Sequence, residues 1–589
     1  MKKKSKKLAN VLLMPLTGLA APCEGSGKGD GSELDPIVVG SFGIPEASPR
    51  FATYHNEDLD GVTLSDDVSW HNGAIYYKPG DYTIKNSNII MNSDADGQDT
   101  NDFSGLGAAV MAVGKGVNLT IEDSKIETSG VLKVAVTTDE AALTVVKNST
   151  VIAKGGTIYD GYISTADKSI MAGPPWVLGL GGSSSEVNAR STDITGWYAV
   201  GVYIDSDIQS AGWGAASSDN GSEMTMTVVN CDISVGQTGY GAYAVDECVE
   251  EYYGTRIKAT TYGVIMTGAK VTFMSYNEGQ KIPVFQFDGD YDKYGIATGG
   301  KKIYTAVSEK AKGNVKSSIV SDNFGFMFHS NRVFGANVVE LFDGTSVVCK
   351  DAVFLLKKMG GEIVVDNAVL ESTEKKVILQ VIDNDDDYVG LDDSNYWGHD
   401  DGYGHTLGWH ETTFNDTFHE EPGYSNEWIA PTSASYLRPS HKYQPFGNWV
   451  LDYKMTNTKV DGDFWNSSGY VGRNPATTLN VSLGRGAVVN GVISAGAFSH
   501  DTKDAKVGNG NWSEAKILGH VTNIPYFNDV NLVKVALSGN ALWNLTGDCI
   551  IDTLTIEGSA SVSIPEGVTL KVRDTVYEAG TLTADTYIS

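Results

Sequence analysis

A short motif returns along this chain at nearly constant intervals. It consists of Asn or Asp, a small residue, any residue, and then Ile or Val, and it follows a run of β-branched residues. Copies end at Ile126 and Val151 and again at Ile208, Ile233 and, in a degenerate copy that begins with Gly254, Ile257, so neighbouring copies in each series lie 24 or 25 residues apart. One such repeat is too short to bury an apolar side on its own, and successive repeats must therefore stack on one another.

Between the copies, short segments alternate apolar and polar residues and are separated by glycine, as in Val117-Asn118-Leu119-Thr120-Ile121. This period of two predicts strands, and no long helical period is evident. The sequence predicts an all-β chain folded as a right-handed parallel β-helix, a solenoid in which each repeat supplies three short strands. Stacked Asn and Ser side chains would satisfy backbone groups at its corners. A propeller or a chain of sandwiches fits less well, because propeller blades are about 40 residues or longer.

A resemblance supports the same fold. The residues that carry it are Asn88-Ile89-Ile90, Ser93-Asp94-Ala95-Asp96-Gly97, Phe103, Gly107-Ala108-Ala109-Val110 and the run from Leu119 to Ile126. They resemble right-handed parallel β-helix proteins of the bacterial surface, which have a pectin-lyase-like fold and include adhesin-like passenger domains and proteins described as carbohydrate-binding. The resemblance covers about residues 60–380 and resumes near 475. It implies a fold and a surface location, and says little about chemistry.

The sequence divides into five parts. Residues 1–22 are predicted to be a secretory signal peptide, because five lysines precede an apolar run that is too short to span a bilayer. The remaining parts are a tether and N-terminal cap (23–60), the β-helix (61–382), an irregular aromatic- and His-rich insertion or lid (383–470), and C-terminal β-helix coils with a cap (471–589). We therefore expect a secreted or cell-surface protein. Cys23 leaves open a lipid anchor, although Pro22 stands where lipoproteins carry a small residue.

Composition excludes several classes of protein. Asp and Glu number 73 against 44 Lys and Arg, and this net charge of −29 argues against a nucleic-acid partner, which needs a basic surface. No second apolar run has membrane length, so a membrane-spanning chain is not expected. Four cysteines remain after Cys23, without a CxxC spacing, and we expect them to be buried free thiols: Cys231, Cys248, Cys349 and Cys549.

The first candidate site lies on the outward face of three successive repeats, where the motif places Asp207, Asp232 and Arg256. Strands of neighbouring repeats lie about 4.8 Å apart, so the two carboxylates would share a proton or bind Ca²⁺. The Arg would neutralise them or contact an anionic substrate. Polysaccharide lyases of β-helix fold are similar in this arrangement and use it for catalysis. The alternative is a solvated ladder of charges.

The second candidate is a series of aromatic residues that follow the motif, namely Trp213, Tyr240, Tyr262 and Phe324. If exposed, these rings would form a platform for sugar or aryl rings. If buried, they would fill the core. A separate segment, Met171–Gly182, does not fit the repeat and contributes Trp176 as a further substrate-binding candidate. Its glycines are not followed by Lys-Ser/Thr, so no nucleotide cofactor is expected.

The third candidate is the insertion. Asp383, Asp385 and Asp387 alternate like calcium ligands but lack the Gly and terminal Glu of an EF-hand, and solvated acidic loops are the alternative. Within the same insertion, His405 and His410 would act as general acid or base, and Trp409 would bind substrate. A structural role for most of the histidines is the alternative.

Three functions fit these features. A dense group of His, Trp, Tyr and Asp in one irregular insertion favours an exported enzyme that acts on carbohydrate, a hydrolase or lyase of the polysaccharide lyase or glycoside hydrolase type. The second is a non-catalytic surface adhesin or carbohydrate-binding protein whose repeats provide length. The third is an enzyme that acts on a small phenolic or aromatic molecule. The expected ligand is a polysaccharide or a small molecule, with Ca²⁺ as the candidate cofactor.

Overall fold

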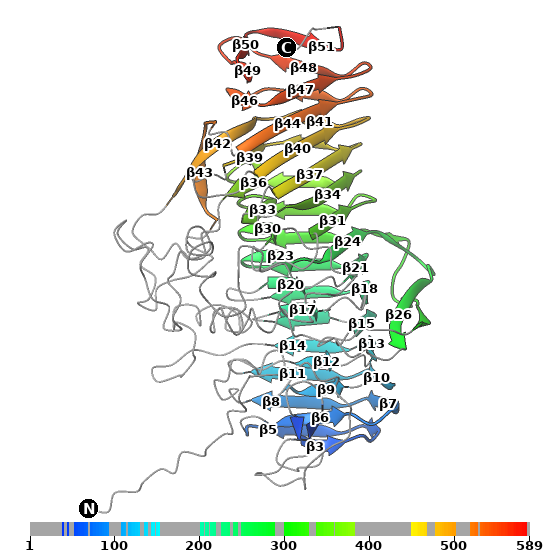
Figure 1. The fold of residues 1–589 in the computed structure, drawn as a ribbon. Coiled ribbons are helices and arrows are strands. Elements are labelled where there is room, and N and C mark those ends of the chain that lie inside the picture. Colours follow the sequence, from blue (N-terminus) through cyan, green and yellow to red (C-terminus); the bar gives the residue numbers. More distant parts are fainter. Residues whose placement is uncertain are drawn as a thin grey trace, which may run out of the picture.

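The computed structural model is all-β over the residues that it describes. These are residues 38–39, 44–45, 52–68, 71–92, 108–113, 116–129, 135–139, 143–147, 149–153, 201–204, 207–210, 213–218, 225–235, 240–245, 249–288, 300–328, 337–357, 360–382, 449–467, 477–501, 519–527 and 531–585. Their regular elements are strands, and they contain no helix long and apolar enough to cross a membrane. Figure 1 shows the strands stacked in one elongated column, with the blue N-terminal strands at one end and the red C-terminal strands at the other.

Three large sheets run along the column. Sheet 1 has the order β4 (Leu59–Asp60), β7 (Gly80–Lys85), β10 (Val117–Glu122), β13 (Leu143–Lys147), β15 (Gly201–Ile204), β18 (Thr225–Val229), β21 (Val249–Tyr253), β24 (Lys270–Met274), β31 (Asn337–Leu341), β34 (Gly361–Asp366), β37 (Trp449–Thr456), β40 (Thr477–Leu483), β44 (Asn531–Leu537) and β47 (Thr553–Ile556). Sheet 2 has the order β35 (Val369–Ser372), β32 (Ser346–Cys349), β29 (Ser318–Ser321), β22 (Arg256–Ala259), β19 (Asp232–Val235), β16 (Asp207–Ser210), β14 (Thr150–Ala153), β11 (Lys125–Ser129), β8 (Asn88–Asn92) and β5 (Thr63–Asp66). Sheet 3 has the order β17 (Trp213–Ser218), β20 (Tyr240–Val245), β23 (Tyr262–Thr267), β30 (Phe324–Phe328), β33 (Phe354–Lys357), β36 (Val377–Ile382), β39 (Asp463–Asn466), β42 (Ile493–His500) and β43 (Val521–Pro525).

Smaller sheets complete the column. One contains β12 (Val136–Asp139), β9 (Val110–Val113), β6 (Asn72–Tyr76) and β3 (Ala52–His55). A five-stranded C-terminal sheet contains β38 (Lys459–Asp461), β41 (Val488–Asn490), β45 (Leu542–Asn544), β48 (Ser561–Ile564) and β51 (Gly580–Thr583). A three-stranded C-terminal sheet contains β46 (Cys549–Ile551), β49 (Leu570–Val572) and β50 (Thr575–Tyr577). Three antiparallel pairs are β1 (Val38–Val39) with β2 (Ile44–Pro45), β25 (Tyr276–Asn277) with β28 (Asn314–Val315), and β26 (Ile282–Asp288) with β27 (Gly300–Ala306).

The chain visits the large sheets in turn. For example, β18, β19 and β20 belong to sheets 1, 2 and 3, and β21, β22 and β23 repeat that order one strand further along each sheet. These strands pair in parallel with their counterparts in the next repeat. At the C-terminal end the last pairings are antiparallel, β48 with β51 and β49 with β50. The all-β class and the parallel sheets are confirmed, and the arrangement is compatible with the predicted β-helix.

The recurring motif marks the corner between sheets 1 and 2. Its first residue has a left-handed backbone at Asn86, Asp123 and Asn230, with φ between 49° and 50°. Asn and Asp tolerate this conformation better than other side chains that carry a Cβ. In the degenerate copy the same position is Gly254, with φ of 59°. The motif therefore begins with Asn, Asp or Gly because the corner requires a positive φ.

The small second residue of the motif forms a ladder along the column. Ser124 Oγ accepts a hydrogen bond from the backbone N–H of Ser87 at 3.0 Å, and Ser149 Oγ accepts one from Ser124 N–H at 3.1 Å. All three serines are buried. The predicted serine ladder at the corners is confirmed at these three repeats.

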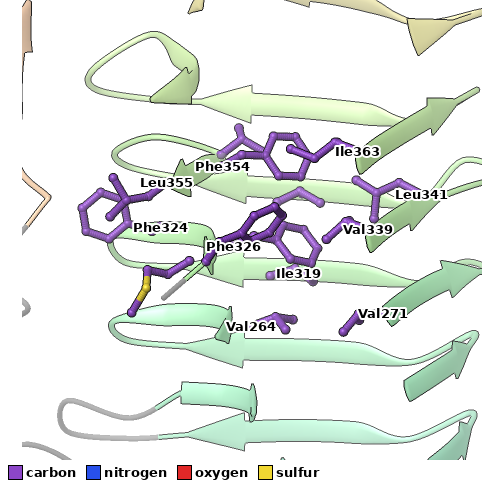
Figure 2. Close-up of a cluster of buried hydrophobic side chains, with 14 of the residues drawn as sticks. Val264, Val271, Ile319, Phe324, Phe326, Val339, Leu341, Phe354, Leu355 and Ile363 are labelled. Carbon is purple, nitrogen blue, oxygen red and sulfur yellow. The ribbon is translucent and has the colours of Figure 1, made fainter. Parts of the chain in front are cut away.

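The core lies between the sheets. Figure 2 shows Phe326 and Phe354 beside Val339, Leu341 and Ile363. The two phenylalanine rings stack with centroids 5.3 Å apart. By contrast, Phe324 and Leu355 lie away from that cluster in Figure 2 and yet are fully buried, so sheet 3 is covered on both faces here.

Three of the cysteines lie in this interior. Cys231, Cys349 and Cys549 are free and buried, as predicted, whereas Cys248 lies outside the described residues. Burial raises the pKa of the Cys349 and Cys549 thiols well above the ordinary value, so both remain protonated at neutral pH.

Candidate functional site

The strand register aligns the three outward charges that the motif spacing predicted to be neighbours. Asp207 of β16 lies opposite Asp232 of β19, and Asp232 lies opposite Arg256 of β22. The alignment follows from the equal length of the repeats, because each strand pairs with its copy in the next repeat. Of Asp207 the structure describes the backbone alone.

Arg256 binds Asp232 through two hydrogen bonds. Its Nε and Nη2 donate to the two carboxylate oxygens at 2.5 and 2.9 Å. Its Nη1 also donates to the backbone oxygen of Gly254 at 2.9 Å. Both oxygens of Asp232 therefore accept hydrogen bonds from the guanidinium, as the charge-ladder alternative predicts. The proposed catalytic and calcium-binding roles of Asp232 stay predictions.

The aromatic series is also in register. Trp213 pairs with Tyr240, Tyr240 with Tyr262, and Tyr262 with Phe324. Tyr262 and Phe324 are 0% exposed, and their ring centroids lie 5.4 Å apart. Tyr262 therefore stacks inside the protein, and the expectation that it lines an open groove is wrong in this structure. The side chains of Trp213 and Tyr240 lie outside the described residues.

Most of the other predicted site residues fall outside the described residues. These are Trp176, Asp383, Asp385, Asp387, His405, Trp409 and His410. Their roles stay predictions. Strand pairing resumes with β37 at Trp449, earlier than the boundary predicted for the insertion, since β37 pairs with β34 and β40.

The described residues also hold an Asp–His contact that the sequence did not predict. His520 Nδ1 lies 2.7 Å from Asp351 Oδ2, and the two side chains are 16% and 8% exposed. The ring of Phe324 packs against the imidazole with centroids 4.8 Å apart. Within the described part of the chain, His520 Nε2 is buried without a hydrogen-bond partner. A proton on Nδ1 of the neutral ring, held by the carboxylate, leaves a lone pair on Nε2.

A second charged pair lies close to this contact. Lys375 Nζ pairs with Asp501, and Thr522 Oγ1 donates to the other oxygen of Asp501 at 2.7 Å. Burial alone would raise the pKa of Asp501, but the hydrogen bonds from Lys375 and Thr522 outweigh it and lower the pKa. Asp501 therefore remains ionised beside His520. Another Asp–His contact, between Asp66 and His71, lies near the N-terminal end.

Among the residues that the structure describes, no group of three or more His, Cys, Asp or Glu side chains could hold a metal ion. The predicted calcium ligands of the insertion are not among those residues.

The chain was compared with known proteins. No protein-family model matches the sequence, and no curated protein matches it significantly.

Proposed function

We propose that this protein is an exported right-handed parallel β-helix that binds carbohydrate at the cell surface without converting it. The fold proposal is supported by the order in which the chain visits three sheets and by the parallel register between repeats. The resemblance to adhesin-like and carbohydrate-binding β-helix proteins supports the location and the ligand class.

One observation favours binding over catalysis. The side chain that was the candidate acid or base in the described part, Asp232, is neutralised by the two hydrogen bonds from Arg256. A carboxylate whose two oxygens both accept hydrogen bonds from a guanidinium has part of its lone pairs occupied, and contact with a substrate would compete with that pairing. A carboxylate that is paired with a guanidinium across neighbouring strands serves instead as a link between repeats.

The test is retention without turnover. Mature protein would be immobilised and exposed to plant and microbial polysaccharides, with mass spectrometry of the supernatant after long incubation. We expect retention of at least one polysaccharide and no change in its chain length, with or without EDTA. Release of shorter or unsaturated products would contradict the proposal.

A second candidate, a carbohydrate-active hydrolase or lyase, is supported by the Asp351–His520 contact. A buried carboxylate that orients a histidine whose other nitrogen is unpartnered is a common arrangement of a general base. If this histidine is catalytic, His520→Gln and Asp351→Asn should each lower turnover by about 100-fold or more. His71→Gln is the matched control, because His71 also contacts an Asp. The same substrate panel, extended with small phenolic molecules, tests the third function.

A further inference from the structure

A patch of three exposed apolar residues, close together in the sequence, lies at the end of β43, where the chain rejoins the column beside Ala495. Ile524, Tyr526 and Phe527 are 62%, 47% and 38% exposed. Tyr526 and Phe527 are the large aromatic side chains that stand out as exposed in the described part of the chain, where the other exposed large apolar residues are aliphatic. Figure 1 shows β42 and β43 at the side of the column.

The backbone under the patch is held firmly. The N–H of Tyr526 donates to the backbone oxygen of Ala495 at 3.0 Å, and its carbonyl accepts a hydrogen bond from Asn531 Nδ2 at 3.0 Å. Asn531 is fully buried, and the same amide group also donates to the backbone oxygen of Gly496 at 3.0 Å. Because the backbone is already held in place, little backbone entropy is lost when a ligand binds here.

The size and surroundings of the patch limit what can occupy it. Three side chains are far fewer than the 20 to 30 residues, burying about 800 Å² per partner, that a stable protein interface needs. The net charge of −29 repels acidic polymers. A neutral polysaccharide fits the small size of the patch, because a pyranose ring presents a flat C–H face of the size of one aromatic ring. It also carries no charge, so the acidic protein does not repel it.

We propose that Tyr526 and Phe527, backed by Ile524, form a platform on which the pyranose rings of a neutral polysaccharide stack. This proposal rests on the carbohydrate-binding function proposed above and assigns a binding site to it. The site lies outside the residues that the motif singles out, since it belongs to a segment between two repeats.

The experiment is isothermal titration of the full mature protein with cellohexaose, xylohexaose and mannohexaose. For the hexasaccharide that binds, the double variant Tyr526→Ala/Phe527→Ala should weaken binding by about tenfold or more, and Tyr526→Trp should retain it, because the larger ring still stacks. Leu542→Ala is the matched control, since Leu542 is as exposed as Phe527 at 38%, and it should change nothing. Thermal unfolding of each variant verifies that the fold is intact.

The outcomes separate the site from the function. Unchanged affinity in the double variant overturns the platform and leaves the proposed function standing. Binding of acidic polygalacturonate alone also overturns the platform and not the function. If no glycan of either kind binds, both proposals fail. A dimer in sedimentation that Tyr526→Asp dissociates would assign the patch to self-association and overturn the platform.

Discussion

Arg256 and Asp232 join neighbouring strands of sheet 2 through a two-pronged hydrogen-bonded ion pair, at 2.5 and 2.9 Å. The side chains are 35% and 52% exposed, so solvent screens their attraction.

We predict that Arg256→Ala lowers the free energy of unfolding by about 1 kcal/mol or less and that 1 M salt removes most of the loss. Urea unfolding at low and high salt measures both. Arg573→Ala, which breaks a single hydrogen bond to Asp552, is the control and should cost less. A loss above about 2 kcal/mol at 1 M salt would contradict a screened surface pair.

Gly263 of sheet 3 lies close to a side chain of sheet 2 and to the next strand of its own sheet. A Cβ placed on it would lie 2.3 Å from Ile319 Cγ2 and 2.6 Å from the backbone oxygen of Gly325. Since a backbone oxygen in a stacked strand cannot move aside, Gly263→Ala should lower the free energy of unfolding by about 1–3 kcal/mol. Denaturant unfolding measures the loss. Gly547→Ala is the control, because its Cβ would meet one side-chain atom at 3.2 Å. Equal stability of the two variants would show that the strands can separate locally.

The sequence predicted the corners of the fold because their chemistry is local. Asn86 and Asp123 occupy a positive-φ position that few other residues tolerate, and Ser124 binds a backbone N–H of the neighbouring repeat, so each repeat needs the same residue types at the same spacing. The register that aligns Asp207 with Asp232 follows directly from that spacing. These features depend only on the residues of the motif and their spacing, and can be predicted without the rest of the chain.

The side-chain environments were less predictable. A period of two does not say whether an aromatic residue is covered, and sheet 3 is buried on both faces, so Tyr262 is buried despite its place in the predicted platform. The contact between Asp351 and His520 joins residues 169 positions apart through a segment outside the repeat. The exposure of Tyr526 likewise depends on how the chain rejoins the column after β43, a segment that is not part of the repeat.

The hydroxyl of Ser124 makes two hydrogen bonds at a buried corner between sheets 1 and 2. Its Oγ accepts from Ser87 N–H at 3.0 Å and donates to the backbone oxygen of Glu122 at 2.7 Å. In Ser124→Ala the buried N–H of Ser87 loses its acceptor, and we expect a loss of about 1–3 kcal/mol in the free energy of unfolding. Ser65→Ala, at an exposed position of β5, should have no measurable effect. Equal stabilities in chemical denaturation would mean that water replaces the hydroxyl.

Glu251 lies on the outward side of sheet 1 and is half-buried. Burial is the main reason that the pKa of its carboxyl is raised, and the charge of Glu340 adds to the effect. A hydrogen bond from Tyr253 and the charge of Lys270 oppose it without cancelling it. The folded protein therefore holds this proton more tightly than the unfolded chain does.

The raised pKa of Glu251 makes the folded protein less stable as the pH rises. As the pH rises from the ordinary Glu pKa of about 4.3 through the raised value, the unfolded chain ionises first, so this group reduces the free energy of unfolding. Above the raised pKa the reduction is complete. Glu251→Gln removes this contribution, and its stability relative to the original protein should be higher at pH 7 than at pH 4. Urea unfolding at both values measures the difference, with Glu566→Gln at an exposed position as control. If Glu251→Gln and the original protein respond identically to pH, Glu251 ionises equally well in the folded and unfolded states.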